Sequence, residues 1–262
     1  MKILHESPLC LMDHIQQFTD GDYCLPHLMD QYEEYKDFFM RSKANGRHIM
    51  MDNSLHELGV PYSEDRLFYW LDELQPDEFF VPDYWEDQTQ SVVSAKRWIQ
   101  YQERYPDTTF IAVVQAKALY EAIICYQIYK DLGYKKIAFS YGASYYNEVH
   151  PHENKAIGKA LGRIDTINKM HNINVIHNND RIHLLGCSVP QEFGYHKDSS
   201  YIESIDTSNP VMAAIQGLKY DTLGLEVKPT SNMNECFEMP LSEIDIELLN
   251  YNVKQFKQIN NL

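Results

Sequence analysis

Eight short apolar runs recur along this sequence, and longer segments with helical spacing of apolar residues separate them. We expect strands at residues 2–5, 23–26, 48–51, 78–81, 110–115, 136–140, 181–186 and 201–205. Strict alternation of strands and helices is typical of a parallel sheet, because each parallel pair needs a crossover connection. Eight strands favour closure over an open sheet, so we predict an α/β fold, a single-domain (β/α)8 TIM barrel over residues 1–262.

The segments between the runs predict helices at residues 31–42, 63–74, 89–105, 118–132, 153–171 and 208–218. Ser63 followed by two acidic residues predicts a helix start, and Gly133 predicts a left-handed helix end. Residues 221–240 lack periodicity and indicate a long loop. Residues 241–262 predict a closing amphipathic helix that begins at Ser242 and buries one apolar stripe, formed by Ile244, Leu248, Leu249, Val253 and Phe256.

Length and composition exclude several classes of protein. The chain has 262 residues, enough for one large core, and no apolar run approaches the roughly 18 residues of a membrane span. Acidic residues and His interrupt the apolar part of its first residues, so we expect a cytosolic protein without a signal peptide. The five Cys are scattered without a CxxC pair, which indicates buried thiols. No GxGxxG or GxxxxGK[ST] motif occurs, which argues against nucleotide cofactors and P-loop chemistry.

The net charge of −15, from 23 basic and 38 acidic residues, is unusual for a nucleic-acid binder. Whole-chain charge does not exclude a local basic patch. Basic residues do gather in the middle of the chain, and we interpret them as solvated helix faces: Lys117, Lys130, Lys135, Lys136, Lys155, Lys159, Arg163 and Lys169.

Carboxylates follow three of the predicted strands. Asp52 ends the run at 48–51, Asp83 follows the run at 78–81, and Asp206 ends the segment 182–206, which reads as strand, Gly turn, short helix and second strand. In a (β/α)8 barrel the carboxyl ends of the strands carry the chemistry. Each Asp taken alone fits the N-cap of the following helix equally well. Taken together, the three predict a nucleophile and an acid/base or substrate-anchoring group.

Two further strand ends carry groups suited to a planar heterocycle. Gln115 offers a donor and an acceptor on one amide. Ser140, Tyr141 and Gly142 follow the next strand, where Gly permits close approach to the backbone and Tyr offers a stacking surface. Satisfied loop polar groups and core packing are the alternatives for each. A metal site at His150, His152 and His177 is disfavoured, because the HxH pattern follows a loop and not the first strand.

At these residues the chain resembles the tRNA-guanine transglycosylases, barrel enzymes that exchange guanine for a 7-deazaguanine base. The resemblance covers roughly residues 45–215. It implies that Asp206 is the nucleophile and Asp52 a catalytic or base-contacting acid. It further implies base contacts by Asp83, Gln115 and the strand end at Ser140, Tyr141 and Gly142, and a pocket floor at Leu185 and Gly186.

The sequence departs from the family pattern in three places. The CxCxxC zinc segment is missing, since only Cys236 lies in that region. The family's Gly-Gly is replaced by Tyr141-Gly142. The family's Pro-Thr-Arg after the nucleophile corresponds to Asn209-Pro210-Val211 here, so the Arg is missing. We therefore expect a divergent member of the family with no metal and no other cofactor. It would be similar to the viral or bacterial relatives that insert 7-deazaguanines into DNA.

The resemblance implies a pentosyltransferase whose partners are a nucleic acid, DNA or tRNA, and a free guanine or 7-deazaguanine base. No membrane partner is expected, and a homodimer is left open. Two other functions stay open. One is a nucleoside or glycoside hydrolase that acts on a small substrate, which suits the acidic charge. The other is a non-catalytic partner subunit of a transglycosylase.

Overall fold

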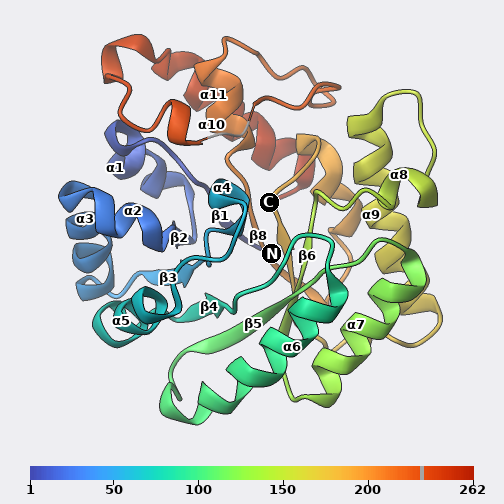
Figure 1. Cartoon of the computed structure of the whole chain (residues 1–262). Coiled ribbons are helices and arrows are strands. Elements are labelled where there is room, and N and C mark those ends of the chain that lie inside the picture. Colours follow the sequence, from blue (N-terminus) through green and yellow to red (C-terminus); the bar gives the residue numbers. More distant parts are fainter. Residues whose placement is uncertain (231–232) are drawn as a thin grey trace. The chain divides into compact units, whose positions relative to one another are not determined.

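The computed structural model describes residues 1–230 and 233–262, and it confirms the predicted (β/α)8 TIM-barrel fold. Eight parallel strands lie in the order β1-β8-β7-β6-β5-β4-β3-β2, with helices between them along the chain (Figure 1). The strands are β1 Lys2–Leu4, β2 Gly21–Cys24, β3 His48–Met51, β4 Glu78–Phe80, β5 Thr109–Val114, β6 Lys136–Ser140, β7 Ile182–Leu185 and β8 Ile202–Asp206.

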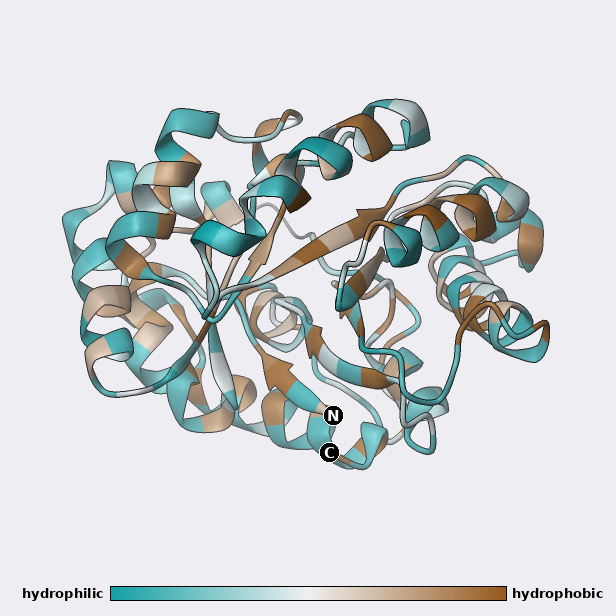
Figure 2. Ribbon diagram, turned by 90° about the horizontal axis from the view of Figure 1, so that it is seen from below, coloured by the Kyte–Doolittle hydropathy of each residue, from teal (hydrophilic) through white to brown (hydrophobic). Residues whose placement is uncertain are grey.

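All eight predicted strands are confirmed, and β3 and β6 have the predicted bounds. Strands of a parallel sheet are buried on both faces, so they read as continuous apolar runs, which Figure 2 shows as hydrophobic arrows. The largest shift is in β2, which begins at Gly21, two residues earlier than expected. A Cβ at Gly21 would lie 2.8 Å from the carbonyl oxygen of His48, so only glycine permits this close pairing with β3.

The predicted helices are also confirmed, and short helices that lack clear periodicity accompany them. The α-helices are α1 Met12–Ile15, α2 Pro26–Gln31, α3 Glu33–Ala44, α4 Leu55–Leu58, α5 Glu64–Leu74, α6 Gln88–Trp98, α7 Leu119–Asp131, α8 Tyr146–Val149, α9 Lys155–Asn172, α10 Asn209–Ile215 and α11 Ile246–Asn260. The 3-10 helices are η1 Leu9–Leu11, η2 Gln16–Phe18, η3 Ile99–Arg104, η4 Pro190–His196, η5 Met233–Glu235 and η6 Leu241–Glu243. Within the described residues, none of these helices combines the length and the apolar character that a membrane crossing requires.

The helix ends differ from the sequence expectations in two places. Ser63 stands at the N-cap of α5, but its side chain makes no capping hydrogen bond. The closing helix does not begin at Ser242. It begins after Asp245, whose carboxylate accepts a hydrogen bond of 2.9 Å from the backbone N–H of Leu248. A carboxylate at the N-cap also suits the helix dipole. Gly133 ends α7 with a φ of +93°, as predicted.

The chain divides into two compact units, residues 1–19 with 140–262, and residues 20–139. In the first unit, α10 and α11 pack with α1 around the predicted apolar stripe, including Ile244, Leu249 and Val253. In the second unit, aromatic rings fill the space between α6 and the sheet. The Phe79 ring lies 5.4 Å from the ring of Trp98 and 5.4 Å from that of Phe110.

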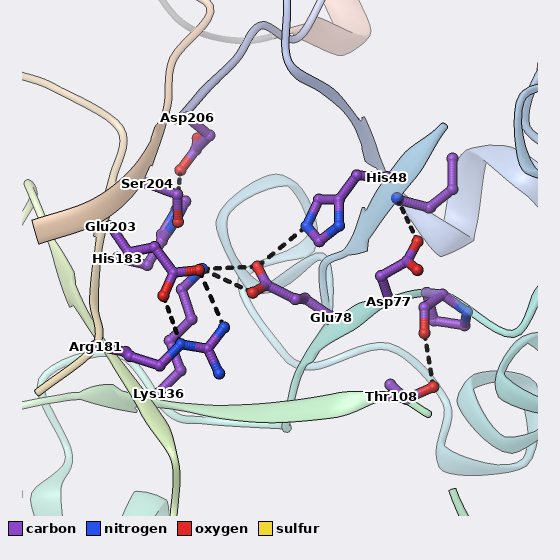
Figure 3. Close-up of polar contacts among 12 residues, drawn as sticks. His48, Asp77, Glu78, Thr108, Lys136, Arg181, His183, Glu203, Ser204 and Asp206 are labelled. Atoms are coloured by element: carbon purple, nitrogen blue, oxygen red, sulfur yellow. Dashed lines mark hydrogen bonds and ion pairs between the residues drawn. The ribbon is translucent and has the colours of Figure 1, made fainter. Parts of the chain in front are cut away.

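Two basic residues that we interpreted as solvated are buried ion-pair partners, so that interpretation is wrong for them. Lys136 of β6 is 1% exposed and donates to both carboxylate oxygens of Glu78 at 2.8 Å (Figure 3). Burial would raise the pKa of Glu78, but His48 and Lys136 outweigh it and lower this pKa to about 2. Arg163 of α9 is fully buried and pairs with Glu192 at 2.5 Å.

His196 in η4 predicts an acid-sensitive step in stability. Its ring is 1% exposed, and neither ring nitrogen has a hydrogen-bond partner among the described residues. Burial lowers the pKa of His196 to about 4, and the charge of Arg163 acts in the same direction. Between pH 6.5 and 4 only the unfolded chain binds this proton, so folding stability falls as the pH falls. The loss from this group between pH 7 and 4 is about 3 kcal/mol.

Urea unfolding of the wild type and His196→Leu at both pH values measures this contribution. The variant should lack the part of the pH dependence that His196 supplies, whereas replacement of the exposed His177 by Leu should leave it unchanged. Equal pH dependence in the wild type and His196→Leu contradicts the prediction.

Candidate functional site

Asp206 is the last residue of β8, and its carboxylate is held from one side. The side chain is 3% exposed. Its Oδ1 accepts a hydrogen bond from Nε2 of His183 at 2.8 Å (Figure 3). The same oxygen accepts from the backbone N–H of Gly186 at 3.2 Å. Its Oδ2 accepts no hydrogen bond from any residue that the structure describes. The carboxylate therefore has a fixed orientation and one uncommitted oxygen.

His183 of β7 lies between Ser204 and Asp206, and it is not among the predicted site residues. Its Nδ1 is 2.8 Å from the hydroxyl oxygen of Ser204. A carboxylate only accepts hydrogen bonds, so the ring proton that faces Asp206 is on Nε2. In the neutral ring Nδ1 then accepts the Ser204 proton. The signal in the sequence was weak: a His inside the otherwise apolar strand β7, and a Ser beside Glu203 in β8.

The Gly186 turn brings the other predicted residues of the first unit to Asp206. Gly186 has a φ of +57°, and a Cβ there would lie 2.5 Å from Cδ1 of Tyr141. The Tyr141 ring therefore rests on this turn, and its backbone N–H donates to the carbonyl of Leu185 at 2.9 Å. Tyr141, Leu185, Gly186 and Asp206 therefore lie together in the structure, and their roles as strand-end contact, pocket floor and nucleophile stay predictions.

The backbone at Gly142 is engaged on both sides, which the sequence did not indicate. Its N–H donates to the hydroxyl of Ser140 at 3.3 Å, and its carbonyl accepts from Lys159 of α9 at 2.9 Å. A second cation, Nζ of Lys228, lies 4.0 Å from the centre of the Tyr141 ring. The loop after β6 therefore contacts two lysines, Lys159 at the Gly142 carbonyl and Lys228 at the Tyr141 ring.

Replacing Gly186 by Ala should destabilise the fold and displace Tyr141. The left-handed φ alone costs about 1–2 kcal/mol for an L-residue, and the contact with the Tyr141 ring adds to this. Gly217 is a matched control, because it has a φ of +68° and open space around it. Urea unfolding should show a larger loss for Gly186→Ala than for Gly217→Ala. Equal losses would mean that the Tyr141 ring does not rest on the turn.

Arg163 binds the backbone carbonyls of the Gly186 turn. Its Nη1 donates to the carbonyl of Leu185 at 2.9 Å, and its Nη2 donates to that of Gly186 at 2.8 Å. Glu192 of η4 takes the remaining Nε–H. The guanidinium fork thereby fixes two consecutive carbonyls, and with them the direction of the Gly186 N–H toward Asp206.

A second polar cluster lies at strand ends of the other unit. Asp83 is 4% exposed, and its two oxygens accept from Asn53 at 2.7 Å and from Gln115 at 2.6 Å. The Gln115 oxygen accepts in turn from the backbone N–H of Glu86 at 2.9 Å. Burial raises the pKa of Asp83 to about 6, although these two hydrogen bonds oppose the shift. The structure thus joins Asp83 and Gln115 and adds Asn53, which is not among the predicted site residues.

Asp52 directly follows β3 and is 8% exposed. Its Oδ2 lies 3.3 Å from the N–H of Ser54, which adopts a left-handed φ of +62°. The oxygen of Asn53 accepts from the N–H of Leu55 at 3.0 Å, so Asn53 supports the start of α4. The turn after β3 is therefore a tight polar turn that leads directly into a short helix.

The N-cap alternative does not hold for two of the three acids. The N-cap of α6 is Asp87, not Asp83, and Asp87 accepts from the N–H of Gln90 at 2.9 Å. The N-cap of α10 is Ser208, two residues beyond Asp206. Neither carboxylate caps the helix that follows it, so the burial of both calls for another explanation. Buried acids at strand ends are common at functional sites.

No group of three or more His, Cys, Asp or Glu residues in the described ranges could hold a metal ion. The His residues considered for a metal have other partners: His150 pairs with Asp165 at 2.8 Å, and His152 hydrogen-bonds to Asn154. None of the five cysteines forms a disulfide. The expectation of a cofactor-free protein stays a prediction.

A comparison with protein-family models finds no match to this chain, and a comparison with curated proteins finds none either. The resemblance to the guanine transglycosylases therefore stays a prediction that depends on the strand-end residues themselves.

Proposed function

We propose that this protein is a base-exchange glycosyltransferase that replaces guanine in a nucleic acid with a 7-deazaguanine base through a covalent Asp206–sugar intermediate. The observation that carries the proposal is the one-sided anchoring of Asp206. Two donors converge on its Oδ1, while Oδ2 accepts no hydrogen bond from the described residues. A buried carboxylate with a fixed direction and one uncommitted oxygen is suited to nucleophilic catalysis.

In the first step Oδ2 of Asp206 attacks C1′ of the target nucleotide. The C1′–N9 bond breaks, its electron pair stays on the guanine, and the guanine takes up a proton. In the second step the incoming base loses its N9 proton, N9 attacks C1′, and Asp206 leaves as a carboxylate. The sequence of attack and displacement parallels that of retaining glycosidases. The target nucleotide leaves its stack to be reached.

Asp83 and Gln115 support base recognition. Gln115 donates one N–H to Asp83 and has a second N–H for a ligand carbonyl, and Asp83 accepts from ligand N–H groups. This pattern matches the N1–H and O6 edge of guanine. Because the pKa of Asp83 is about 6, part of its population carries a proton near neutral pH. Asp83 is then a proton donor for the leaving base, with Asp52 as a second acid.

An exchange assay with labelled guanine tests the proposal. The wild-type protein is incubated with guanine-containing duplex DNA, single-stranded DNA or tRNA, and the label that precipitates with the polymer is counted. We expect incorporation into one of these polymers and a polymer–protein adduct on a denaturing gel. Release of guanine without incorporation would support a hydrolase instead. The absence of both exchange and release would support the non-catalytic partner.

A further inference from the structure

We propose that His183 is a positioning residue that directs Oδ2 of Asp206 at the substrate and stabilises the charge on Oδ1. This inference depends on the proposed function, because it concerns the same carboxylate. His183 reaches no substrate atom in this role, since its side chain is fully buried. It acts only through Asp206, because its N–H donates the shorter of the two hydrogen bonds to Oδ1.

A register shift between β7 and β8 places His183 on the Asp206 face. Ile182 pairs with Ile202, but the next residue, His183, pairs with Ser204, so one residue of β8 is skipped. Without this bulge His183 would pair with Glu203, whose carboxylate instead binds Arg181. Side chains alternate between the two faces of a strand, so the bulge turns His183 toward Ser204 and Asp206. Bulges that redirect one side chain are common beside active sites.

Ser204 fixes the His183 ring in the donating orientation. Its hydroxyl lies 2.8 Å from Nδ1 and the residue is 1% exposed, so water does not compete for this position. With Nδ1 accepting from Ser204, the ring keeps its proton on Nε2, toward Asp206. Ser204, His183 and Asp206 form a chain of hydrogen bonds, but the burial of Ser204 excludes it as a nucleophile.

The two donors on Oδ1 act in both steps of the exchange. In the first step they orient Oδ2 toward C1′, and in the second they stabilise the charge that returns to the carboxylate. In the covalent intermediate Oδ2 is bonded to C1′, and Oδ1 is the ester carbonyl oxygen that still accepts from His183 and Gly186. When the incoming base attacks C1′, the C1′–Oδ2 bond breaks and its electron pair returns to the carboxylate. The donors then stabilise the returning charge. Removal of one such preorganised donor typically lowers a rate by about 10²–10³-fold.

Single-turnover exchange by His183→Leu, His183→Gln and the wild type tests the inference. We expect His183→Leu to lower the rate at saturating base by about 10²-fold, with little change in the half-saturating concentration of base. We expect His183→Gln to recover at least tenfold of this loss, because its amide N–H replaces the donor. A packing role alone would not distinguish the two variants in this way. The exposed His152→Leu is the control, with the wild-type rate expected.

Ser204→Ala keeps the test valid if His183→Leu does not fold. It leaves the imidazole in place but frees its orientation, and we expect a loss of about tenfold in the same rate. A folded His183→Leu or Ser204→Ala with the wild-type rate overturns the inference, as does a His183→Gln rate no better than that of His183→Leu. If the wild type shows no exchange, the proposed function fails first. If the wild type exchanges bases and the variants do too at full rate, only the role of His183 fails.

Discussion

Replacing Asp206 by Asn is expected to abolish the polymer–protein adduct and to lower base exchange by about 10⁴-fold or more, as for other covalent nucleophiles. An amide is a poor nucleophile and a poor leaving group compared with a carboxylate. The replacement keeps the shape of the side chain, and its oxygen still accepts from His183 and Gly186. Folding should therefore be preserved, and adduct formation on denaturing gels together with labelled-guanine exchange measures the loss.

Glu203→Gln is the matched control on the same strand. Glu203 precedes Ser204 and pairs with Arg181, with 25% of its side chain exposed. The change is again from carboxylate to amide, but here the carboxylate binds Arg181, whereas His183 binds Asp206. Both the adduct and the exchange should therefore persist. An Asp206→Asn variant that still exchanges bases would remove Asp206 as the nucleophile, and with it the proposed mechanism.

The strands could be predicted because their signal is local. Strands buried on both faces require runs of apolar residues, and β3 and β6 could be delimited from such runs alone. Helix starts were harder, because several residues near each start can cap. Asp245, not Ser242, caps α11, and the side chain of Ser63 makes no capping bond at all. The choice depends on the path of the preceding loop, which the local sequence does not determine.

The positions of the predicted site residues followed from topology, whereas their partners did not. Asp206 is the last residue of β8, and Asp83 follows β4. The predicted strand bounds were therefore enough to place both residues near strand ends. The hydrogen bond from His183 requires the bulge between β7 and β8, which no local pattern in the sequence signals. The bond from Asn53 to Asp83 joins two different strand ends. Such pairings depend on register and are outside the reach of motif reasoning.

Burial of charge was the largest error of the sequence interpretation. Lys136 and Arg163 belong to a basic stretch, but each meets a carboxylate distant in sequence, Glu78 or Glu192. A basic residue inside an apolar strand, such as Lys136 in β6, was itself a signal of pairing, because an unpaired buried charge is too costly. Arg163 gave no such signal, since helix α9 carries polar residues on more than one face.

Replacing Arg163 by Met is therefore expected to destabilise the protein by about 3–5 kcal/mol, because the buried carboxylate of Glu192 loses its partner. The carbonyls of Leu185 and Gly186 lose the guanidinium as a donor as well, although Leu185 keeps the bond from the N–H of Tyr141. We expect a lower midpoint in urea unfolding and, in folded protein, weaker base exchange, since the Gly186 N–H no longer points firmly at Asp206. Arg97→Met is the control, because Arg97 and Glu64 are 52% and 43% exposed and such pairs contribute less than about 1 kcal/mol.

The double variant Arg163→Met/Glu192→Leu separates the two consequences of losing Arg163. Removing the carboxylate as well eliminates the uncompensated buried charge, so most of the lost stability should return. The carbonyls of Leu185 and Gly186 stay without their guanidinium donor, so base exchange should stay low. Recovery of stability without recovery of exchange assigns Arg163 to the Gly186 turn. Recovery of both would mean that the ion pair alone matters and that the turn holds its shape without the guanidinium.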